Sequence, residues 1–85
     1  MKISKVDEYL KRPYLRIIIH DEETETYCTL ILEFPGCIAQ GNTVAEAYKN
    51  LENAAESWIE AAIELGQSIP EPIGIQKAMA MVLKR

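Results

Sequence analysis

A stretch of thirteen residues, Phe34 to Glu46, constrains the fold of this chain more than any other part of its sequence. Pro35 followed by Gly36 suits the two central positions of a type II turn, because proline fixes a negative φ and glycine accepts the positive φ that a side chain resists. Thr43 and Glu46 then form the pattern T-x-x-E, in which the threonine oxygen accepts from a free N–H of the first helical turn and the glutamate reaches back to the cap N–H. The chain is therefore predicted to reverse at Pro35 and Gly36 and to start a helix at Thr43.

A long amphipathic helix is predicted from residue 44 to residue 65. Its apolar residues recur at steps of three and four, which places them along one helical stripe. Trp58 lies on this stripe and is expected in the core, with its N–H seeking an acceptor. Gly66 occupies the position of a left-handed C-cap. The opposite face is markedly acidic, and its spacing is compatible with a solvated surface and with a docking face for a cationic partner.

Strands are predicted on the N-terminal side of that helix. Residues 14–20 and 27–34 are rich in β-branched and aromatic side chains, and the polar DEETET between them is typical of an exposed hairpin loop. Residues 38–40 can return along the second strand as a third. Ser4 with Asp7 can cap a brief N-terminal helix. The predicted fold class is α+β, a small antiparallel sheet of three or four strands packed on one long α-helix and preceded by a short N-terminal helix.

Alternation divides the side chains of the two long strands between the faces of the sheet, because successive residues point to opposite sides. The more apolar set is predicted to pack on the helix; it comprises Leu15, Ile17, Ile19, Cys28, Leu30, Leu32 and Phe34. The other set mixes large apolar and polar side chains, and its exposure predicts contact with a partner or a second subunit. The candidate partner-binding residues are Tyr14, Arg16, Ile18, Tyr27, Ile31 and Glu33. A tail of the chain folding back across this set is the alternative.

Three blocks of the sequence resemble the HicB antitoxin family. The family's turn block PDLPGC corresponds to LEFPGC at 32–37, its strand and TQGDT block to IAQGNT at 38–43, and its G-x-x-[IP]-P-x-P exit to GQSIPEP at 66–72. The likeness covers residues 14–72, with Leu32, Glu33 and Asn42 departing from the usual family residues. The structural motif is carried by Pro35, Gly36, Gly41, Thr43, Glu46 and Gly66.

The resemblance implies a partial RNase H-like fold of order β-β-β-α-β that lacks the carboxylate cluster of two-metal nucleases. In the family this domain binds the small basic ribonuclease toxin HicA and blocks its active site, so the resemblance implies an antitoxin with a HicA-like toxin as partner. Glu33 and its turn, or the acidic helix face, are expected to supply the complementary potential. The alternative is an orphan oligomeric interaction or regulatory module without a toxin.

Composition adds further expectations. The 85 residues suit a single domain, 1–85, and a chain of this size buries only about 60% of its unfolded surface, so a dimer or tetramer is expected. Thirteen acids against nine bases give a net charge of −4, which disfavours nucleic acid as a ligand of this chain alone. The sequence has neither an apolar run of membrane length nor an apolar signal core, so a cytoplasmic protein without membrane contact is expected.

No catalytic residue, metal site or cofactor is predicted, and the chain is not expected to be an enzyme. Cys28 and Cys37 lack metal-site spacing and are expected as free thiols. His20 is the single histidine, and no nucleophile or second histidine completes a relay with it.

The last thirteen residues, 73–85, fit two structures. Their apolar residues match one face of a helix and also the alternation of a strand. The resemblance favours a strand, whereas the propensities of alanine, methionine, leucine and lysine favour a helix. Thirteen residues do not build a DNA-binding motif by themselves, so autoregulation through this segment is not expected.

Overall fold

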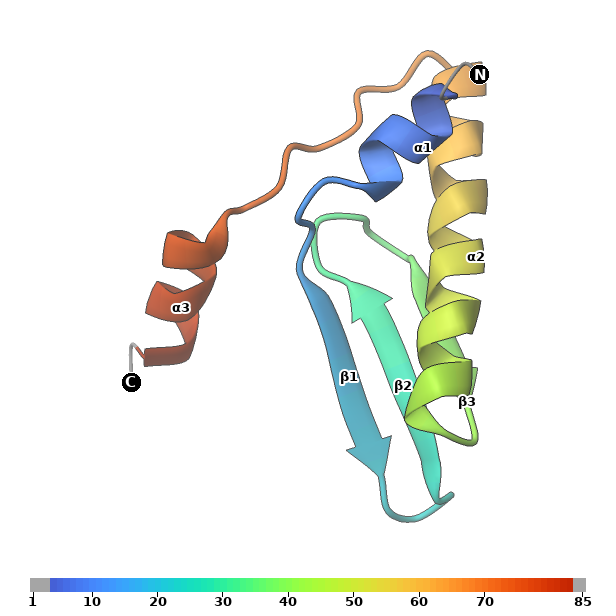
Figure 1. Cartoon of the computed structure of the whole chain (residues 1–85), viewed down its shortest axis with the longest axis vertical. Coiled ribbons are helices and arrows are strands. Elements are labelled where there is room, and N and C mark those ends of the chain that lie inside the picture. The colour runs from blue at the N-terminus through green and yellow to red at the C-terminus, as the bar shows by residue number, and fades with distance from the viewer. Residues whose placement is uncertain (1–3, 84–85) are drawn as a thin grey trace.

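The computed structural model describes residues 4–83, which form a three-stranded antiparallel sheet and three helices (Figure 1). The elements are α1 (Lys5–Leu10), β1 (Arg16–Asp21), β2 (Thr26–Ile31), β3 (Ile38–Gly41), α2 (Val44–Glu64) and α3 (Ile75–Leu83). The strand order is β1-β2-β3, and α2 packs on β3 and β2. The predicted α+β class, with a sheet on one long helix and a short helix before it, is confirmed.

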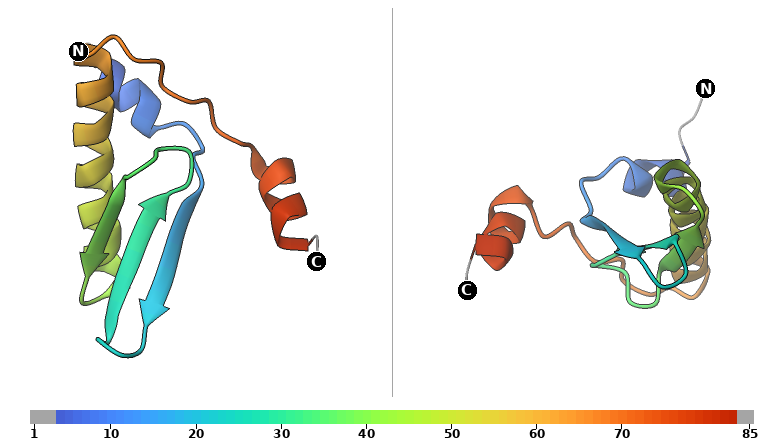
Figure 2. Two further views of the ribbon diagram at one scale, coloured as in Figure 1. Left: turned by 180° about the vertical axis from the view of Figure 1, so that it is seen from behind. Right: turned by 90° about the horizontal axis from the view of Figure 1, so that it is seen from below.

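The C-terminal segment is helical where the structure describes it. Residues 75–83 form α3, so of the two alternatives the helix is the observed one, and residues 4–83 contain no fourth strand. The final strand that the β-β-β-α-β order implied is therefore absent from the described part of the chain, and residues 84 and 85 lie outside it. An extended segment carries the chain from α2 past α1, and α3 then stands apart on the β1 side of the sheet (Figure 2).

The turn after β2 has the predicted type II geometry. Gly36 has a φ of 82°, and the Cys37 N–H donates to the carbonyl oxygen of Phe34 at 3.0 Å. A second turn comes directly before it, because the Phe34 N–H donates to the carbonyl of Ile31 at 3.1 Å. This turn ends β2 at Ile31, so Phe34 no longer follows the strand alternation.

Side chains cap the starts of two helices. The Thr43 hydroxyl accepts from the Glu46 N–H at 3.0 Å, and the Glu46 carboxylate accepts from the Asn42 N–H at 3.0 Å, one residue earlier than the predicted cap N–H. Ser4 caps α1 in the same way by accepting from the Asp7 N–H at 3.1 Å. Both helix starts are thus determined by local sequence.

The end of α2 is a Schellman motif. Gly66 has a φ of 67°, and its N–H donates to the carbonyl oxygen of Ile63. The Gln67 N–H donates to the carbonyl oxygen of Ala62 at 2.9 Å. Two carbonyls of the last turn are thereby satisfied, and the chain leaves the helix at the predicted glycine.

The prediction of which sheet face packs on α2 is wrong. The register pairs Arg16 with Ile31 and Ile18 with Thr29, so the strand residues do divide into the two predicted sets. Thr29 is fully buried and its hydroxyl donates to the Ala47 carbonyl of α2 at 3.2 Å, while Ile31 is only 2% exposed. The set expected outside therefore faces the helix, and the more apolar set is turned away from it, except for Phe34, which packs on α2 as predicted.

The helix-facing set can be buried because its polar groups find partners. The Arg16 guanidinium donates to Glu52 of α2 at 2.7 Å, and the Tyr14 hydroxyl donates to the Pro70 carbonyl at 2.7 Å. A buried polar group is costly only when it lacks such a hydrogen bond. The prediction ranked the two faces by hydrophobicity alone, and this ranking does not register such pairings.

Three aromatic rings form the centre of the core. The Phe34 ring stacks on Trp58 with centroids 4.3 Å apart and planes at 2°, and Tyr14 packs on Phe34 at 4.5 Å. The indole N–H of Trp58 donates to the Pro35 carbonyl at 2.9 Å, which supplies the expected acceptor. Phe34 reaches this position because the turn at Ile31 frees it from the outer face.

Close approach of β3 and α2 requires the glycine at position 41. A Cβ built on Gly41 would lie 2.4 Å from the backbone nitrogen of Ala47 and 2.7 Å from its Cα. We therefore expect Gly41→Ala to lower the free energy of unfolding by about 1–3 kcal/mol or more, measured by urea denaturation. Gly66→Ala is the control, because no atom crowds that site and only the positive φ opposes a side chain, at a cost of about 1 kcal/mol. A Gly41→Ala protein as stable as the unsubstituted chain would contradict this packing.

Candidate partner-binding surfaces

Charge is distributed very unevenly along this chain. Between residues 17 and 76, eleven of the thirteen acids occur with a single base, Lys49. The other two acids and eight bases lie at the two ends of the sequence. The body of the domain is therefore far more acidic than the net charge of −4 suggests.

The exposed side of α2 carries a stripe of glutamates. Glu56, Glu60 and Glu64 are all exposed and follow one another at spacings of four residues. Like charges at this spacing destabilise a helix by about 0.2–0.5 kcal/mol per pair, and Glu64 also lies at the helix C-terminus, where the macrodipole disfavours negative charge. Within residues 4–83, none of the three forms a salt bridge. The stripe is an exposed negative surface that the described residues do not neutralise.

The hairpin between β1 and β2 is a second acidic surface. Asp21, Glu22, Glu23 and Glu25 are all exposed, and Glu25 has a φ of 55°. The Asp21 carboxylate accepts from the Glu23 N–H at 3.0 Å, which helps to close the loop. The hairpin therefore presents four acids at the end of the sheet away from α1 (Figure 1).

Glu33 has a structural role that its proposed partner contact did not anticipate. Its carboxylate is 9% exposed and accepts from the Leu15 N–H at 2.9 and 3.1 Å and from the Ile73 N–H at 3.0 Å. One side chain thus connects the start of β1, the turn after β2 and the segment that leads to α3. Glu33 is therefore not an exposed charge available to a partner.

The other candidate partner-binding residues are predicted on an open face, and apart from Ile18 the structure does not expose them. Tyr14 and Ile31 are buried in the core, and Arg16 is paired with Glu52. Ile18 is exposed because β1 is an edge strand that α2 does not cover, and Tyr27 is half-buried. Contact of these residues with a partner stays a prediction without its original support.

Arg16 connects three elements on the helix side of the sheet. Besides Glu52, its guanidinium donates to the carbonyls of Tyr14 and Leu10 at 3.3 Å each. Burial alone would lower the pKa of Arg16, but the hydrogen bond and charge of Glu52 outweigh it, so the pKa is raised. The Arg16–Glu52 pair holds the domain together. It does not neutralise the exposed glutamates Glu56, Glu60 and Glu64 of α2.

Within residues 4–83, no element packs closely on the opposite face of the sheet, and its one charged residue is Asp21 at the hairpin end of β1. We call it the outer apolar face and define it as Leu15, Ile17, Ile19, Cys28, Leu30, Leu32 and Ile38. None of these residues is buried, and Ile19 and Ile38 are 50% and 57% exposed. Sequence reasoning missed this surface, because its higher hydrophobicity predicts burial against α2.

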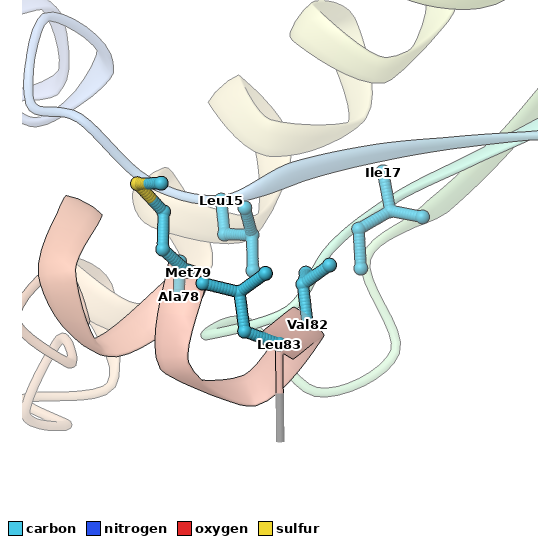
Figure 3. Close-up of a pocket in the computed structure, with 6 residues that line it drawn as sticks. All are labelled: Leu15, Ile17, Ala78, Met79, Val82 and Leu83. Atoms are coloured by element: carbon cyan, nitrogen blue, oxygen red, sulfur yellow. The ribbon is translucent and has the colours of Figure 1, made fainter. Parts of the chain in front are cut away.

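An apolar groove of about 500 Å³ separates this face from α3 (Figure 3). Leu15 and Ile17 line it from β1, and side chains of α3 line the other side, namely Ala78, Met79, Val82 and Leu83. No residue of α3 is buried. Among the described residues, no polar side chain lines the groove and could orient a polar small molecule there.

Neither thiol is placed for chemistry. Cys28 is half-buried and Cys37 is buried, and both are free. Burial raises the pKa of the Cys37 thiol, which disfavours the reactive thiolate. In the part of the chain that the structure describes, no three His, Cys, Asp or Glu side chains gather into a metal-binding group, and no helix is long and apolar enough to span a membrane.

Comparison with known proteins gives a family match over most of the chain. The family model described as a HicB-like antitoxin of bacterial toxin–antitoxin systems matches residues 15–82. A UPF0150 protein of Thermoplasma acidophilum, Ta0767, is 33% identical over 54 residues, which are 64% of this chain and 78% of that protein. No solved structure matches significantly.

The hydrogen bonds of Glu33 predict a large effect of its removal. Glu33→Ala leaves the Leu15 and Ile73 N–H groups without their acceptor, and we expect it to lower the free energy of unfolding by about 2–4 kcal/mol in urea denaturation. Glu71→Ala is the matched control, because Glu71 is exposed and within residues 4–83 pairs only with Arg12, at 3.2 Å, so a change of about 0.5 kcal/mol or less is expected. Equal midpoints for both variants would rule out the connecting role of Glu33.

Stability should decrease at alkaline pH. Burial raises the pKa of Tyr14 above its ordinary 10.0 and that of Cys37 above its ordinary 9.0. Both groups become charged on losing a proton, and burial disfavours that charged form. Above the pKa of the unfolded state, the folded state therefore binds more protons than the unfolded state. The stabilisation that is fully present below the unfolded-state pKa is lost as the pH rises through the folded-state pKa. We expect urea midpoints under reducing conditions to fall above pH 9, and to fall less steeply in Cys37→Ala. A midpoint that rises over this range would contradict the assignment.

Proposed function

Because this chain belongs to the HicB-like antitoxins of bacterial toxin–antitoxin systems, we propose that it binds a small basic ribonuclease toxin of the HicA type and blocks RNA cleavage by that toxin. The observation that carries the proposal is the family match over residues 15–82, which includes the sheet, α2 and nearly all of α3. We further propose that residues 1–85 act as one domain in the cytoplasm, where such a toxin would meet mRNA.

Electrostatics supports this kind of partner. A protein that binds RNA must present positive charge to phosphate groups, and an acidic surface can compete for the same positive groups. The body of this chain, residues 17–76, has eleven acids and one base. Complementary potential of this kind raises association rates from about 10⁵–10⁶ to as much as 10⁸–10⁹ M⁻¹s⁻¹ at low salt.

We assign the main role in this attraction to the Glu56, Glu60 and Glu64 stripe of α2. The stripe is exposed, rigidly spaced by the helix and free of salt bridges among the described residues. Glu33, the other acid considered from sequence, already accepts hydrogen bonds from two backbone N–H groups. Inhibition by this surface requires no catalytic group on this chain.

The test begins with the protein encoded by the gene next to this one. We expect a small basic ribonuclease that co-purifies with this chain and loses its RNA-cleaving activity in the complex. The triple variant Glu56→Lys, Glu60→Lys and Glu64→Lys should lower the association rate by about tenfold or more at low salt, with the difference shrinking at high salt as the charges are screened. Stopped-flow or surface-based kinetics measures both effects.

A matched control separates the stripe from net charge. The triple variant Glu22→Lys, Glu23→Lys and Glu25→Lys changes net charge by the same amount but alters the hairpin, and it should associate faster than the α2 variant. Equal rates for the two triple variants would remove the α2 stripe from the proposal. A neighbouring protein that neither binds nor cleaves RNA would favour the orphan interaction module.

A further inference from the structure

We propose that a second copy of this chain covers the outer apolar face, with the α3 helix of each copy packed across the sheet of the other. This proposal concerns a surface different from the acidic stripe of α2 and does not rest on the proposed toxin.

The first observation is an inversion of burial between the two sheet faces. The chain covers the face that contains Thr29 and Arg16 with its own α2, and it leaves open the face whose side chains are mainly apolar, with Asp21 at its hairpin end as the one charge among the described residues. An antiparallel sheet with one solvated face normally alternates apolar inside with polar outside. This sheet is apolar on the side away from α2 as well, which is typical of a sheet covered on both faces.

The second observation is that α3 has no packing partner sufficient to stabilise it. The helix has nine residues, and isolated helices shorter than about 12–15 residues are marginal in water. None of its residues is buried, and Val82 is 70% exposed. The groove of about 500 Å³ between α3 and β1 is far larger than the voids of a packed interior (Figure 3). Contacts from outside this copy are needed to hold α3 as a helix.

The exposed apolar area is of the size that a dimer requires. Eight large apolar side chains of the outer apolar face and α3 are each 38–74% exposed. At roughly 100 Å² of apolar area for a whole side chain, they leave on the order of 500 Å² open in each copy. Two copies that cover this area would bury about 1,000 Å² in total, which is the threshold for a specific interface.

Charge also favours a copy of the same chain over a basic partner at this surface. The α3 helix contains one base, the exposed Lys77, and no acid, whereas the hairpin residues 21–25 contain four acids and no base. Two copies therefore offer opposite charges to each other although each is acidic overall, as a twofold symmetric contact requires. A basic toxin would find no acid on α3 and, on this face of the sheet, Asp21 alone among the described residues.

The orientation of α3 relative to the domain depends on the backbone at Gly74. The segment before it is held to its own domain by the Tyr14 hydroxyl on Pro70 and by the Ile73 N–H on Glu33. Gly74 follows with a φ of 97°, and α3 begins immediately after it. Because the anchor ends at Ile73, α3 can pack on a second copy without disturbing the core.

The test is the oligomeric state of the full chain without any partner, measured by sedimentation equilibrium over a wide concentration range. We expect a reversible dimer, and we expect Val82→Glu to raise the dissociation constant by about tenfold or more, because a charge would be buried in an apolar contact. Val44→Glu is the matched control, since Val44 is 48% exposed at the start of α2 and lies outside the proposed contact, so its dimer should dissociate as the unsubstituted one does.

A second variant tests the sheet side of the contact. Ile19 is a half-exposed residue of β1, and Ile19→Glu should also raise the dissociation constant of the dimer by about tenfold or more. Circular dichroism of this variant should show that α2 still folds. A chain that stays monomeric at all concentrations, or a dimer unchanged by both variants, would overturn the proposal. The proposal would also be overturned if the chain were a monomer and Val82→Glu and Ile19→Glu weakened only the binding of a basic toxin. That result would make the toxin the occupant of this surface.

Discussion

The carboxylate of Glu33 is the interaction on which the arrangement of this chain depends. It accepts hydrogen bonds from the N–H groups of Leu15 at the entry to β1 and of Ile73 ahead of α3, and Glu33 itself lies in the turn that ends β2. These contacts join three segments that are distant in sequence, and they set the direction in which α3 leaves the domain. A buried carboxylate is stable in this position because its oxygens have backbone donors.

Polar groups of the sheet face that packs on α2 are hydrogen-bonded to that helix, and this leaves the more apolar face of the sheet open. Since Thr29 and Arg16 can be satisfied by α2, the helix packs on the more polar face, and the outer apolar face is left for another surface. The result is a domain with two different exteriors. Within residues 4–83, the α2 side presents unpaired negative charge suited to a basic protein, and the opposite side presents mainly apolar area suited to a copy of itself.

Local sequence determined the parts of the fold whose hydrogen bonds are local. The Pro35–Gly36 turn, the Thr43 cap and the Gly66 exit close through contacts within a few residues, so their chemistry can be read in order along the chain. The helical stripe of α2 and the division of strand residues into two sets follow from periodicity in the same way.

The sequence by itself determined the element types, the turn, the caps, the acidic surface and the likeness to a family, because each depends on residue type and spacing. Only the tertiary structure decided which sheet face meets α2, that Glu33 is an internal connector and that residues 75–83 form a helix standing apart from the sheet. These outcomes depend on partners such as Ala47 and Ile73, which lie eighteen and forty residues away from the groups they bind. The strength of a buried hydrogen bond depends on where its partner lies in space, and hydrophobic patterning along the chain contains no information about that position.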